Sequence, residues 1–593
     1  MFQPARHSVK TLGRTICLRQ LSQQCRNNGA AVLTLVNKNK CSAVPRRHFH
    51  HPTEPNVVCS NYGDITVPDC TIADYVWNGL DKWADKTAVV CGITGKGYSY
   101  AQAHKMSTAF AACLRNKLKL KDGDCIAIML PNSPEFPLAT LGSIQAGLVV
   151  TTVNPIYTAE EIERQLENSN TKVVITTAKC YKDVSIAIKN LGKNLPVIIA
   201  ECDLKMPHPE GTIKFAEFAE NFGENTDCLK EVRRHGDDTV FLPYSSGTTG
   251  MPKGVELTNK NIVANCIQMN AQKICIVLPT TETHQDVTIC VLPFFHIYGL
   301  VVTMLSRLAF GMKLVTIPKF VPETFLSAQE RYKASVLFLV PPIVLFMGSY
   351  SEVSSVHLDP IRTVMSGAAP LASTDVDRFL AKTKTKVAFM QGYGLTETSP
   401  VALMQERGNP NYASVGHPTP STDAKIVSLE NENKVLGPNE VGELWLRGPQ
   451  VMKGYYNNQA ANDDIFRPDG WMRTGDIAHY DDNHAFYITD RLKELIKVKG
   501  YQVAPAELEG ILRSHNELSE AVVIGIPHPT NGEIPKAFVV KKKNKSPSAE
   551  DIKKFVEEKV ASYKRLGDVQ FIDEIPKNAA GKILRREVKR LYT

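Results

Sequence analysis

The sequence predicts an α/β protein with parallel-rich sheets, followed by a small α+β unit at the C-terminal end. From about residue 80, short apolar segments rich in β-branched residues alternate with amphipathic segments. Residues 171–177, 287–292 and 334–340 are apolar examples, and residues 159–168 are an amphipathic one. Continuously apolar strands that alternate with helices are typical of parallel sheets covered by helices on both faces.

The pattern changes near residue 490, where a compact unit of about 100 residues is predicted. Its expected elements are a helix at 506–515, strands at 521–526 and 535–541, and a helix at 549–564. We therefore expect three parts, namely a leader at 1–53, a large unit at 54–490 and a small unit at 491–593, with a boundary at 490–493.

Composition excludes several classes of protein. A chain of 593 residues with 43% hydrophobic residues can bury large cores. The longest apolar segment, 136–153, contains proline, glycine and polar residues, so we expect a buried helix followed by a strand and no transmembrane segment. The 14 cysteines include no Cys-x-x-Cys pair, which removes the sequence support for structural zinc or a redox dithiol.

The positive charge belongs to the N-terminal segment. Residues 1–53 carry nine Lys or Arg and no Asp or Glu, so removing these nine charges from the net +8 leaves about −1 for the rest. The remaining chain therefore predicts no basic face for nucleic acid. The segment has Arg and Lys at near-helical spacing and no long apolar run, which is typical of a mitochondrial matrix transit peptide. Cytosolic and peroxisomal locations are the alternatives, although the chain ends in Leu-Tyr-Thr instead of Ser-Lys-Leu.

The first of five chemical motifs is YSSGTTGMPKG at residues 244–254. Glycines such as Gly247 let backbone amides approach a phosphate closely, and Lys253 adds a positive charge. The hydroxyl-bearing residues of the loop are Ser245, Ser246, Thr248 and Thr249. The spacing is not that of a Walker A loop, so the segment predicts a phosphate-binding loop of another kind.

Two further motifs supply groups suited to a nucleotide. In QGYGLTETSP at residues 391–400, the ring of Tyr393 can stack on a base and Thr396 can hydrogen-bond to a phosphate. Glu397 is an oxygen ligand suited to Mg²⁺. The third motif combines TGD at 474–476 with DRLK at 490–493, and a carboxylate such as Asp476 can bind both hydroxyls of a ribose.

Two lysine-bearing motifs lie near the C-terminal end. They are KVKGYQ at 497–502 and PKNAAGKI at 576–583, in which Lys582 follows a glycine-bearing loop. Taken singly, each motif also fits a turn, a surface loop or a solvated charge. Their order and spacing together are far more specific.

The five motifs resemble those of the adenylate-forming enzymes, which include acyl-CoA synthetases, 4-coumarate–CoA ligases and firefly luciferases. The resemblance covers residues 60–593 and includes LPFFHIYG (292–299), SGAAPL (366–371) and GELWLRGP (442–449). Within that family, the motifs resemble most those of the 4-coumarate–CoA ligase-like acyl-CoA ligases. It implies a large N-terminal domain of several subdomains and a small mobile C-terminal domain. It also implies that ATP and a carboxylic acid form an acyl-adenylate with release of pyrophosphate, and that coenzyme A then displaces AMP.

The resemblance also implies a role for each matching residue. Tyr393 and Gly367 would sandwich the adenine, with Gln391 and Gly392 in the same motif. The phosphate and metal contacts would be residues 245–249, Lys253, Thr396 and Glu397, the last of these bearing on Mg²⁺. The ribose and hinge residues would be Asp476, Arg491 and Lys493. The lysines and their neighbours in the small domain would be Lys582 for adenylation, Lys497 and Gln502 for the rotated state, and Lys499 and Gly500 for coenzyme A.

His296 matches the family histidine beside the reacting carboxylate, and the expected catalytic set is His296, Thr396, Glu397, Lys497 and Lys582. The expected acyl pocket comprises His296, Tyr298, Gly299, Ser366, Gly367, Ala368, Pro400 and Val401. Small residues and apolar walls favour an aromatic, cinnamate-like or medium-chain acid.

Two other functions fit parts of the pattern. A luciferase-like adenylating monooxygenase shares the adenylation residues, but Phe295 stands before His296 where luciferases carry a second histidine. A catalytically inactive adenylate-binding scaffold is disfavoured because Lys497, Lys582 and Glu397 are all present. The sequence therefore favours an acyl-CoA ligase.

Overall fold

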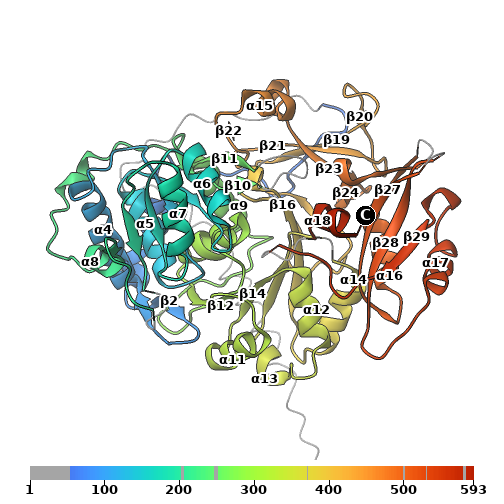
Figure 1. Ribbon diagram of the computed structural model, residues 1–593, viewed down its shortest axis with the longest axis horizontal. Coiled ribbons are helices and arrows are strands. Elements are labelled where there is room, and N and C mark those ends of the chain that lie inside the picture. The colour runs from blue at the N-terminus through green and yellow to red at the C-terminus, as the bar shows by residue number, and fades with distance from the viewer. Residues whose placement is uncertain are drawn as a thin grey trace, which may run out of the picture.

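The computed structural model describes residues 54–201, 206–245, 252–369, 371–498, 501–528, 531–578 and 583–592. The expected leader at 1–53 lies outside these ranges. Within them, four sheets with their helices form a large unit, and a fifth sheet forms a small unit beside it (Figure 1). The predicted α/β fold class is confirmed.

The largest sheet has the strand order β10-β11-β9-β5-β4-β6-β7-β8, with β22 paired to β11. Its strands are β4 Cys125–Ile128, β5 Val149–Thr152, β6 Thr171–Thr176, β7 Val197–Ile199, β8 Ile213–Lys214, β9 Thr239–Phe241, β10 Tyr244–Ser245, β11 Lys253–Thr258 and β22 Gly454–Tyr455. The strands from β9 to β8 pair in parallel, and those around β11 pair antiparallel. The strand expected at 171–177 is β6, so that prediction is confirmed.

A second sheet, ordered β12-β13-β2-β3, lies beside the first. Its strands are β2 Thr87–Cys91, β3 Gly97–Ser99, β12 Val287–Cys290 and β13 Lys313–Thr316. The helices of this half are α2 Ile72–Trp77, α3 Leu80–Trp83, α4 Tyr100–Asn116, α5 Glu135–Gln145, α6 Ala159–Asn168, α7 Tyr181–Asn190, α8 Phe215–Ala219, α9 Asn259–Gln268 and α10 Ser306–Leu308. Helix α6 begins at a capping box between Thr158 and Glu161 and buries Ile162 and Leu166, as its amphipathic pattern predicts.

The third sheet, ordered β14-β15-β16-β17-β18, is parallel from β14 to β16 and antiparallel beyond. Its strands are β14 Val336–Leu339, β15 Thr363–Ser366, β16 Ala388–Gly394, β17 Val401–Met404 and β18 His417–Pro418. The accompanying helices are α11 Pro322–Tyr332, α12 Pro341–Ser349, α13 Ser355–Leu358 and α14 Ser373–Ala381. An eight-residue π-helix, Tyr298–Leu305, follows β12 of the second sheet and leads through α10 to β13.

The fourth sheet is antiparallel throughout, which the sequence did not predict. Its strands are β1 Val58–Cys59, β19 Asp423–Val427, β20 Val435–Leu436, β21 Gly442–Arg447, β23 Met472–Tyr480 and β24 Phe486–Arg491. All six residues of β21 are buried, so this strand lacks the apolar–polar alternation that marks most antiparallel strands. The short helix α15 Gln459–Ile465 lies between β22 and β23.

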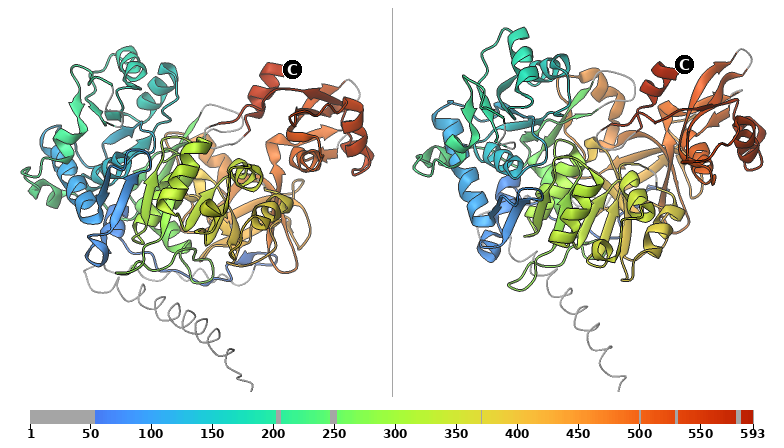
Figure 2. Two further views of the ribbon diagram at one scale, coloured as in Figure 1. Left: turned by 90° about the horizontal axis from the view of Figure 1, so that it is seen from below. Right: turned by 60° about the horizontal axis from the view of Figure 1, so that its bottom comes forward.

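The small C-terminal unit packs on one side of the large one (Figures 1 and 2). Its strands are β25 Ile496–Val498, β26 Tyr501–Val503, β27 Leu518–His528, β28 Gly532–Lys541 and β29 Asp568–Phe571, and its helices are α16 Pro505–Arg513, α17 Ala549–Glu557 and α18 Arg585–Tyr592. The helix expected at 549–564 is shorter than predicted. It ends at Glu557 because the chain must turn back for β29 to pair in parallel with β28.

Hydrophobic clusters define separate cores for the two units. One cluster of the C-terminal unit includes Leu508, Val523, Val539 and Ile552, and a second gathers around Phe538. The remaining clusters contain only residues of the large unit. Each unit therefore buries its own apolar surface, as independently folding domains do.

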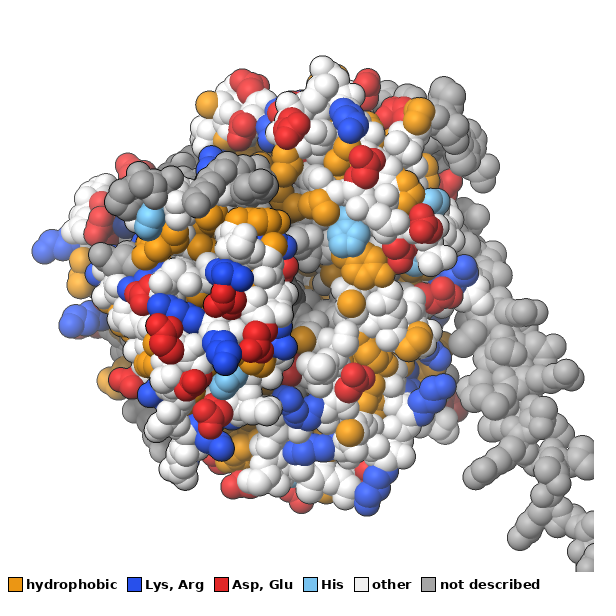
Figure 3. Space-filling model, turned by 90° about the vertical axis from the view of Figure 1, so that its right-hand side faces the viewer, with side chains coloured by type: hydrophobic (Ala, Val, Ile, Leu, Met, Phe, Trp, Pro, Cys, Tyr) orange, Lys and Arg blue, Asp and Glu red, His pale blue; other side chains and the backbone are white. Residues whose placement is uncertain are grey.

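The surface mixes charges of both signs. On the face of the molecule shown in Figure 3, Lys and Arg side chains are interspersed with Asp and Glu side chains. In the part of the chain that the structure describes, no helix has the length and apolar character needed to cross a bilayer.

Candidate active site

A cavity of about 700 Å³ lies where the two units meet. The large unit supplies most of its lining, and the small unit adds Lys577, Asn578 and Leu584. The predicted residues that line it are Ser245, Lys253, His296, Tyr298, Gly367, Ala368, Gly392, Tyr393, Thr396, Glu397, Pro400, Val401, Asp476 and Arg491. Strands of three sheets thus bring residues from distant parts of the sequence to one concave site of the size usual for ligand pockets.

Asp476 links the middle of β23 to the neighbouring strand β24 and to the aromatic residue of the second motif. The Tyr393 hydroxyl donates to Asp476 Oδ2 at 2.6 Å, and Arg491 Nε lies 3.2 Å from Oδ1. Burial raises the pKa of Tyr393 well above its usual range, and the Asp476 carboxylate raises it further. The hydroxyl therefore stays protonated, and its hydrogen bond fixes the tyrosine ring relative to the carboxylate.

Glu397 has a tyrosine partner from a different strand. The hydroxyl of Tyr455, on β22, donates to Glu397 Oε1 at 2.8 Å. Lys253 Nζ lies 4.7 Å from the centre of the Tyr455 ring, and both residues line the cavity. Tyr455 therefore joins the first and second motifs through one side chain.

His296 has its ring orientation set by the backbone that follows it. The amide N–H of Tyr298 donates to His296 Nδ1 at 3.3 Å. Since Nδ1 accepts this hydrogen bond, the neutral imidazole carries its proton on Nε2. The structure thereby presents an N–H donor at the histidine's far edge.

The apolar wall of the cavity includes backbone segments that pack closely against their neighbours. A Cβ added to Gly367 would lie 3.2 Å from the Gly392 carbonyl oxygen and 3.6 Å from the Tyr298 ring. Val401 is held on both sides by Asn265, which donates to the Val401 carbonyl at 2.7 Å and accepts from its amide at 3.1 Å. The wall at Val401 is therefore fixed by buried hydrogen bonds.

Among the predicted site residues whose side chains the structure describes, four lie outside the cavity lining. Gly299 is needed for packing, because a Cβ there would lie 2.1 Å from the Pro293 carbonyl oxygen. Ser366 is fully buried at the end of β15, where its neighbours Met365 and Gly367 line the cavity. Gln391 uses its amide group to donate to the backbone carbonyls of Leu371 and Tyr412.

Lys497 is the fourth of these residues. It is exposed on β25, and its backbone amide donates to Glu533. The structure thus shows the arrangement in which the segment around Lys577 and Leu584, and not Lys497, contributes to the cavity.

For several predicted residues the structure gives no side-chain position. Ser246, Gly247, Thr248, Thr249, Lys499, Gly500 and Lys582 lie outside the described residues, as do the side chains of Lys493 and Gln502.

Other residues that line the cavity were not predicted from the sequence motifs. Tyr455, Glu443, Arg473 and Asp464 all face the cavity, as do Ile156 and Gln165 from the region of α6. Glu443 stands inside the quoted segment GELWLRGP, but nothing in the local pattern shows that its strand lies beside the TGD segment. Pairing of β21 with β23 places them together.

No group of three or more His, Cys, Asp or Glu side chains within the described ranges could hold a metal ion. Mg²⁺ in nucleotide sites is bound by one or two carboxylates together with substrate phosphates. Glu397, on the cavity wall, fits that limited requirement.

Comparisons with known proteins agree with the motifs. The model described as "AMP-binding enzyme" matches residues 76–456, and that described as "AMP-binding enzyme C-terminal domain" matches residues 507–582. 4-Coumarate–CoA ligase 1 of Arabidopsis thaliana is 39% identical over 558 residues, covering 92% of this chain and 97% of the relative. 4-Coumarate–CoA ligase 1 of Petroselinum crispum is 38% identical, covering 91% and 97%.

Solved structures extend the similarity to the fold. ATP-bound MatB from Rhodopseudomonas palustris matches with a TM-score of 0.77 at 26% identity, covering 88% of this chain and 99% of that chain. The o-succinylbenzoate CoA synthetase MenE from Bacillus subtilis, in complex with the acyl-adenylate intermediate OSB-AMP, matches with a TM-score of 0.73 at 26% identity, covering 88% and 98%. Because one family model spans more than half of the chain and the relatives align over nearly their whole length, the chain belongs to the AMP-binding enzyme family, as the motifs predicted.

Proposed function

We propose that the chain activates an aromatic, cinnamate-like or medium-chain carboxylic acid as an acyl-adenylate and transfers the acyl group to coenzyme A. The chain is an AMP-forming acid–CoA ligase, in keeping with its full-length similarity to 4-coumarate–CoA ligases. One observation carries the assignment of the site. A single cavity joins the nucleotide motifs, His296 and the segment around Lys577 from the other unit.

In the proposed first step, an acid carboxylate oxygen bonds to the α-phosphorus of ATP and the bond to pyrophosphate breaks. The ring of Tyr393, oriented through Asp476, would support the adenine, while Asp476 would bind the ribose hydroxyls. Thr396 would contact the α-phosphate, and Lys253 and the 245–249 loop the outer phosphates. His296 would donate its Nε2–H to the acid's carboxylate, because Nδ1 already accepts a hydrogen bond.

Mg²⁺ is proposed to enter with ATP and to be held by Glu397 together with phosphate oxygens. When bound, it neutralises charge on the phosphates. Tyr455 would fix the Glu397 carboxylate through its hydrogen bond.

In the second step, the thiol of coenzyme A loses its proton to solvent, the thiolate sulfur bonds to the acyl carbon, and the carbon–oxygen bond to AMP breaks. AMP leaves readily because its negative charge is spread over phosphate oxygens. We propose that the small unit turns near Lys493 between the two steps. Lys582 would then serve adenylation, while Lys497, Lys499, Gly500 and Gln502 would face the adenylate and coenzyme A after the turn.

The charges around the cavity support an apolar acid. The described cationic side chains that line it are Lys253, Arg473, Arg491 and Lys577. Lys253 lies over the ring of Tyr455. Arg473 forms an ion pair with Glu443, Arg491 with Asp476, and Lys577 with Glu520. Among the residues described, therefore, no uncommitted cation is placed to bind a second carboxylate of a dicarboxylic acid.

The acid class is tested with purified protein and a panel of carboxylic acids running from acetate through medium-chain acids to cinnamates. AMP release that depends on both the acid and coenzyme A is measured for each. We expect the highest kcat/KM with an apolar acid of medium length or with an aromatic acid. A preference for acetate or for a dicarboxylic acid would contradict the proposed substrate class.

Replacing Gly367 with leucine is expected to reduce the use of bulky acids. The new side chain would begin 3.2 Å from the Gly392 carbonyl oxygen and fill part of the cavity. Overpacking typically costs about 1–3 kcal/mol, so kcat/KM for cinnamate-like acids is expected to fall roughly 5- to 150-fold. Short acids are expected to lose less, as measured by the same AMP-release assay.

A matched control is Gly223→Leu, at an exposed glycine whose added Cβ would meet no atom within 4 Å. This variant is expected to keep the wild-type preference among acids. Equal losses for short and bulky acids in Gly367→Leu, with ATP binding unchanged, would show that Gly367 does not form the acyl wall.

We further propose that the enzyme works in the mitochondrial matrix. The support is the acid-free segment with nine Lys or Arg before Glu54. Residues 1–53 fused to a soluble reporter are expected to carry it into the matrix, with shortening of the fusion seen by immunoblotting of cell fractions. A reporter left uncut in the cytosol would argue against import. A second fusion in which the Arg and Lys residues of the segment are replaced by glutamine is the control.

A further inference from the structure

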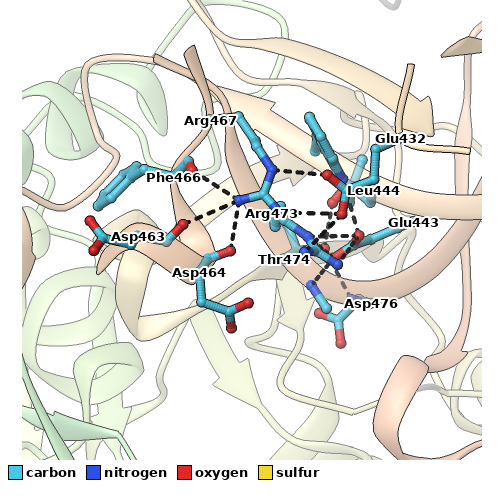
Figure 4. A network of polar contacts seen from close by, with 12 residues as sticks. Glu432, Glu443, Leu444, Asp463, Asp464, Phe466, Arg467, Arg473, Thr474 and Asp476 are labelled. Atoms are coloured by element: carbon cyan, nitrogen blue, oxygen red, sulfur yellow. Dashed lines mark hydrogen bonds and ion pairs between the residues drawn. The ribbon is translucent and has the colours of Figure 1, made fainter. Parts of the chain in front are cut away.

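We propose that Glu443 is a positioning residue for the ribose site, because it holds the backbone that carries Asp476. Residues 474–476 form a bulge within strand β23, where its register against β21 shifts, and we call this bulge the turn. The inference rests on the proposed function, in which Asp476 binds the ribose hydroxyls. Figure 4 shows the network, in which carboxylates and arginines from β21, β23 and the segment after α15 converge beside residues 474–476.

Glu443 reaches the turn from the neighbouring strand. It lies on β21, is only 4% exposed and borders the cavity. Its Oε1 accepts the backbone N–H of Gly475 at 3.1 Å, and its Oε2 accepts the indole N–H of Trp445 at 3.1 Å. One carboxylate therefore joins a rigid aromatic side chain to the backbone immediately before Asp476.

Arg473 provides the charge that makes this burial tolerable. Its Nε lies 3.0 Å and its Nη2 also 3.0 Å from Glu443 Oε2, while Nη1 lies 3.1 Å from Glu432. Burial by itself would lower the pKa of Arg473, but the hydrogen bond and charge of Glu443 raise it. A buried carboxylate would be costly without such a partner, so the two side chains act as one ionised pair.

The turn needs support from outside because glycine can adopt many backbone conformations and does not fix one by itself. Gly475 has φ +69°, although a Cβ there would meet no atom within 4 Å, so crowding does not impose this conformation. Hydrogen bonds hold it instead. In addition to the bond from Gly475 to Glu443, the Thr474 hydroxyl donates to the Leu444 carbonyl at 2.7 Å and accepts from the Asp476 amide at 3.1 Å.

The position of the Asp476 carboxylate follows from that of the turn. Asp476 is 3% exposed and is joined to Tyr393 and Arg491. Without the acceptor for Gly475, the turn can adopt other backbone conformations, which moves the carboxylate relative to a bound ribose. Glu443 itself needs no contact with the nucleotide.

Glu432 offers a matched control in the same network. It binds Arg473 at 3.1 Å and pairs with Arg467, which donates to the backbone carbonyls of Asp464 and Phe466. No hydrogen bond links Glu432 to residues 474–476 among the contacts of the described chain. Glu432→Gln therefore perturbs the charges of the network and leaves the acceptor for Gly475 in place.

The test compares ATP with 2′-deoxy-ATP and 3′-deoxy-ATP in the whole protein, with one good acid substrate and coenzyme A. Since a hydrogen bond to a charged group contributes about 1.5–3 kcal/mol, wild-type kcat/KM is expected to favour ATP by about 10- to 150-fold. Asp476→Ala is expected to bring this ratio close to one. Glu443→Gln is expected to lower the ratio about 3- to 10-fold, and Glu432→Gln to change it less than about 2-fold.

Melting temperatures and a second variant separate positioning from general stability. Glu443→Asp keeps the negative charge but withdraws the acceptor from Gly475, so it is expected to lower the ratio as Glu443→Gln does. Equal loss with all three nucleotides in both Glu443 variants would overturn the inference, whatever their melting temperatures. If Asp476→Ala itself leaves the ratio unchanged, the ribose assignment of the proposed function fails, and this inference fails with it.

Discussion

Lys582→Ala is expected to slow acyl-adenylate formation by about 10²–10³-fold, which is the usual consequence of losing one preorganised charge contact. The proposed reason is that Lys582 stabilises negative charge as it develops on the oxygen between the acid and the α-phosphate. The measurement is pyrophosphate release from ATP and acid without coenzyme A. Thioester formation from a supplied acyl-adenylate is expected to survive.

Lys497→Ala is the matched comparison, because both lysines belong to the small unit. Lys497 is exposed on β25 and away from the cavity, so its loss is expected to spare adenylation. If the small unit turns between the steps, Lys497→Ala instead slows thioester formation from the adenylate. Loss of the same half-reaction in both variants would show that the two lysines act in one arrangement.

Gly394→Ala is expected to lower the free energy of unfolding by about 3 kcal/mol, at the upper end of the usual range for overpacking. An added Cβ would lie 1.9 Å from the Pro400 carbonyl oxygen, which is backbone and cannot rotate away. Relief requires β16 and the Pro400–Val401 wall to separate. Because misplacement by about 1 Å can cost roughly 10²-fold in rate, kcat/KM is expected to fall by about that factor.

Thermal or urea unfolding, run beside the AMP-release assay, checks this result. Gly510→Ala is the control, since its added Cβ would meet nothing within 4 Å and Gly510 lies within helix α16. Alanine there is expected to raise stability by up to about 1 kcal/mol through helix propensity, with activity unchanged. Wild-type stability and activity in Gly394→Ala would contradict the close approach of these strands.

The parallel strands could be predicted because their signal is local. The apolar segments at β6, β12 and β14 lie between turns and amphipathic stretches, and α6 matches its predicted bounds. The antiparallel fourth sheet could not be predicted in the same way. Its strand β21 is buried along its whole length, and its pairing partners are set by contacts distant in sequence.

In the candidate site, too, residues with a local sequence signal could be predicted, and residues placed by distant contacts could not. Motif residues such as Tyr393, Glu397 and Asp476 could be identified because their chemistry is visible in short segments, and all three line one cavity. Tyr455 could not, since it acquires a role only by standing 2.8 Å from Glu397, 58 positions away in the chain. Gly299 lies outside the cavity lining, and its missing side chain allows close backbone packing against Pro293, a role that the sequence pattern alone does not distinguish from lining a pocket.

The two separate cores bear on how the enzyme loses activity. Each unit has its own buried apolar clusters, whereas the cavity takes residues from both. Calorimetric melting is therefore expected to give two transitions instead of one, so a single midpoint temperature would not describe the molecule. Inactivation by heat would follow whichever unit melts first. Cleavage near residues 490–493 is likewise expected to leave two folded fragments, each with its own core, and neither with a complete catalytic site.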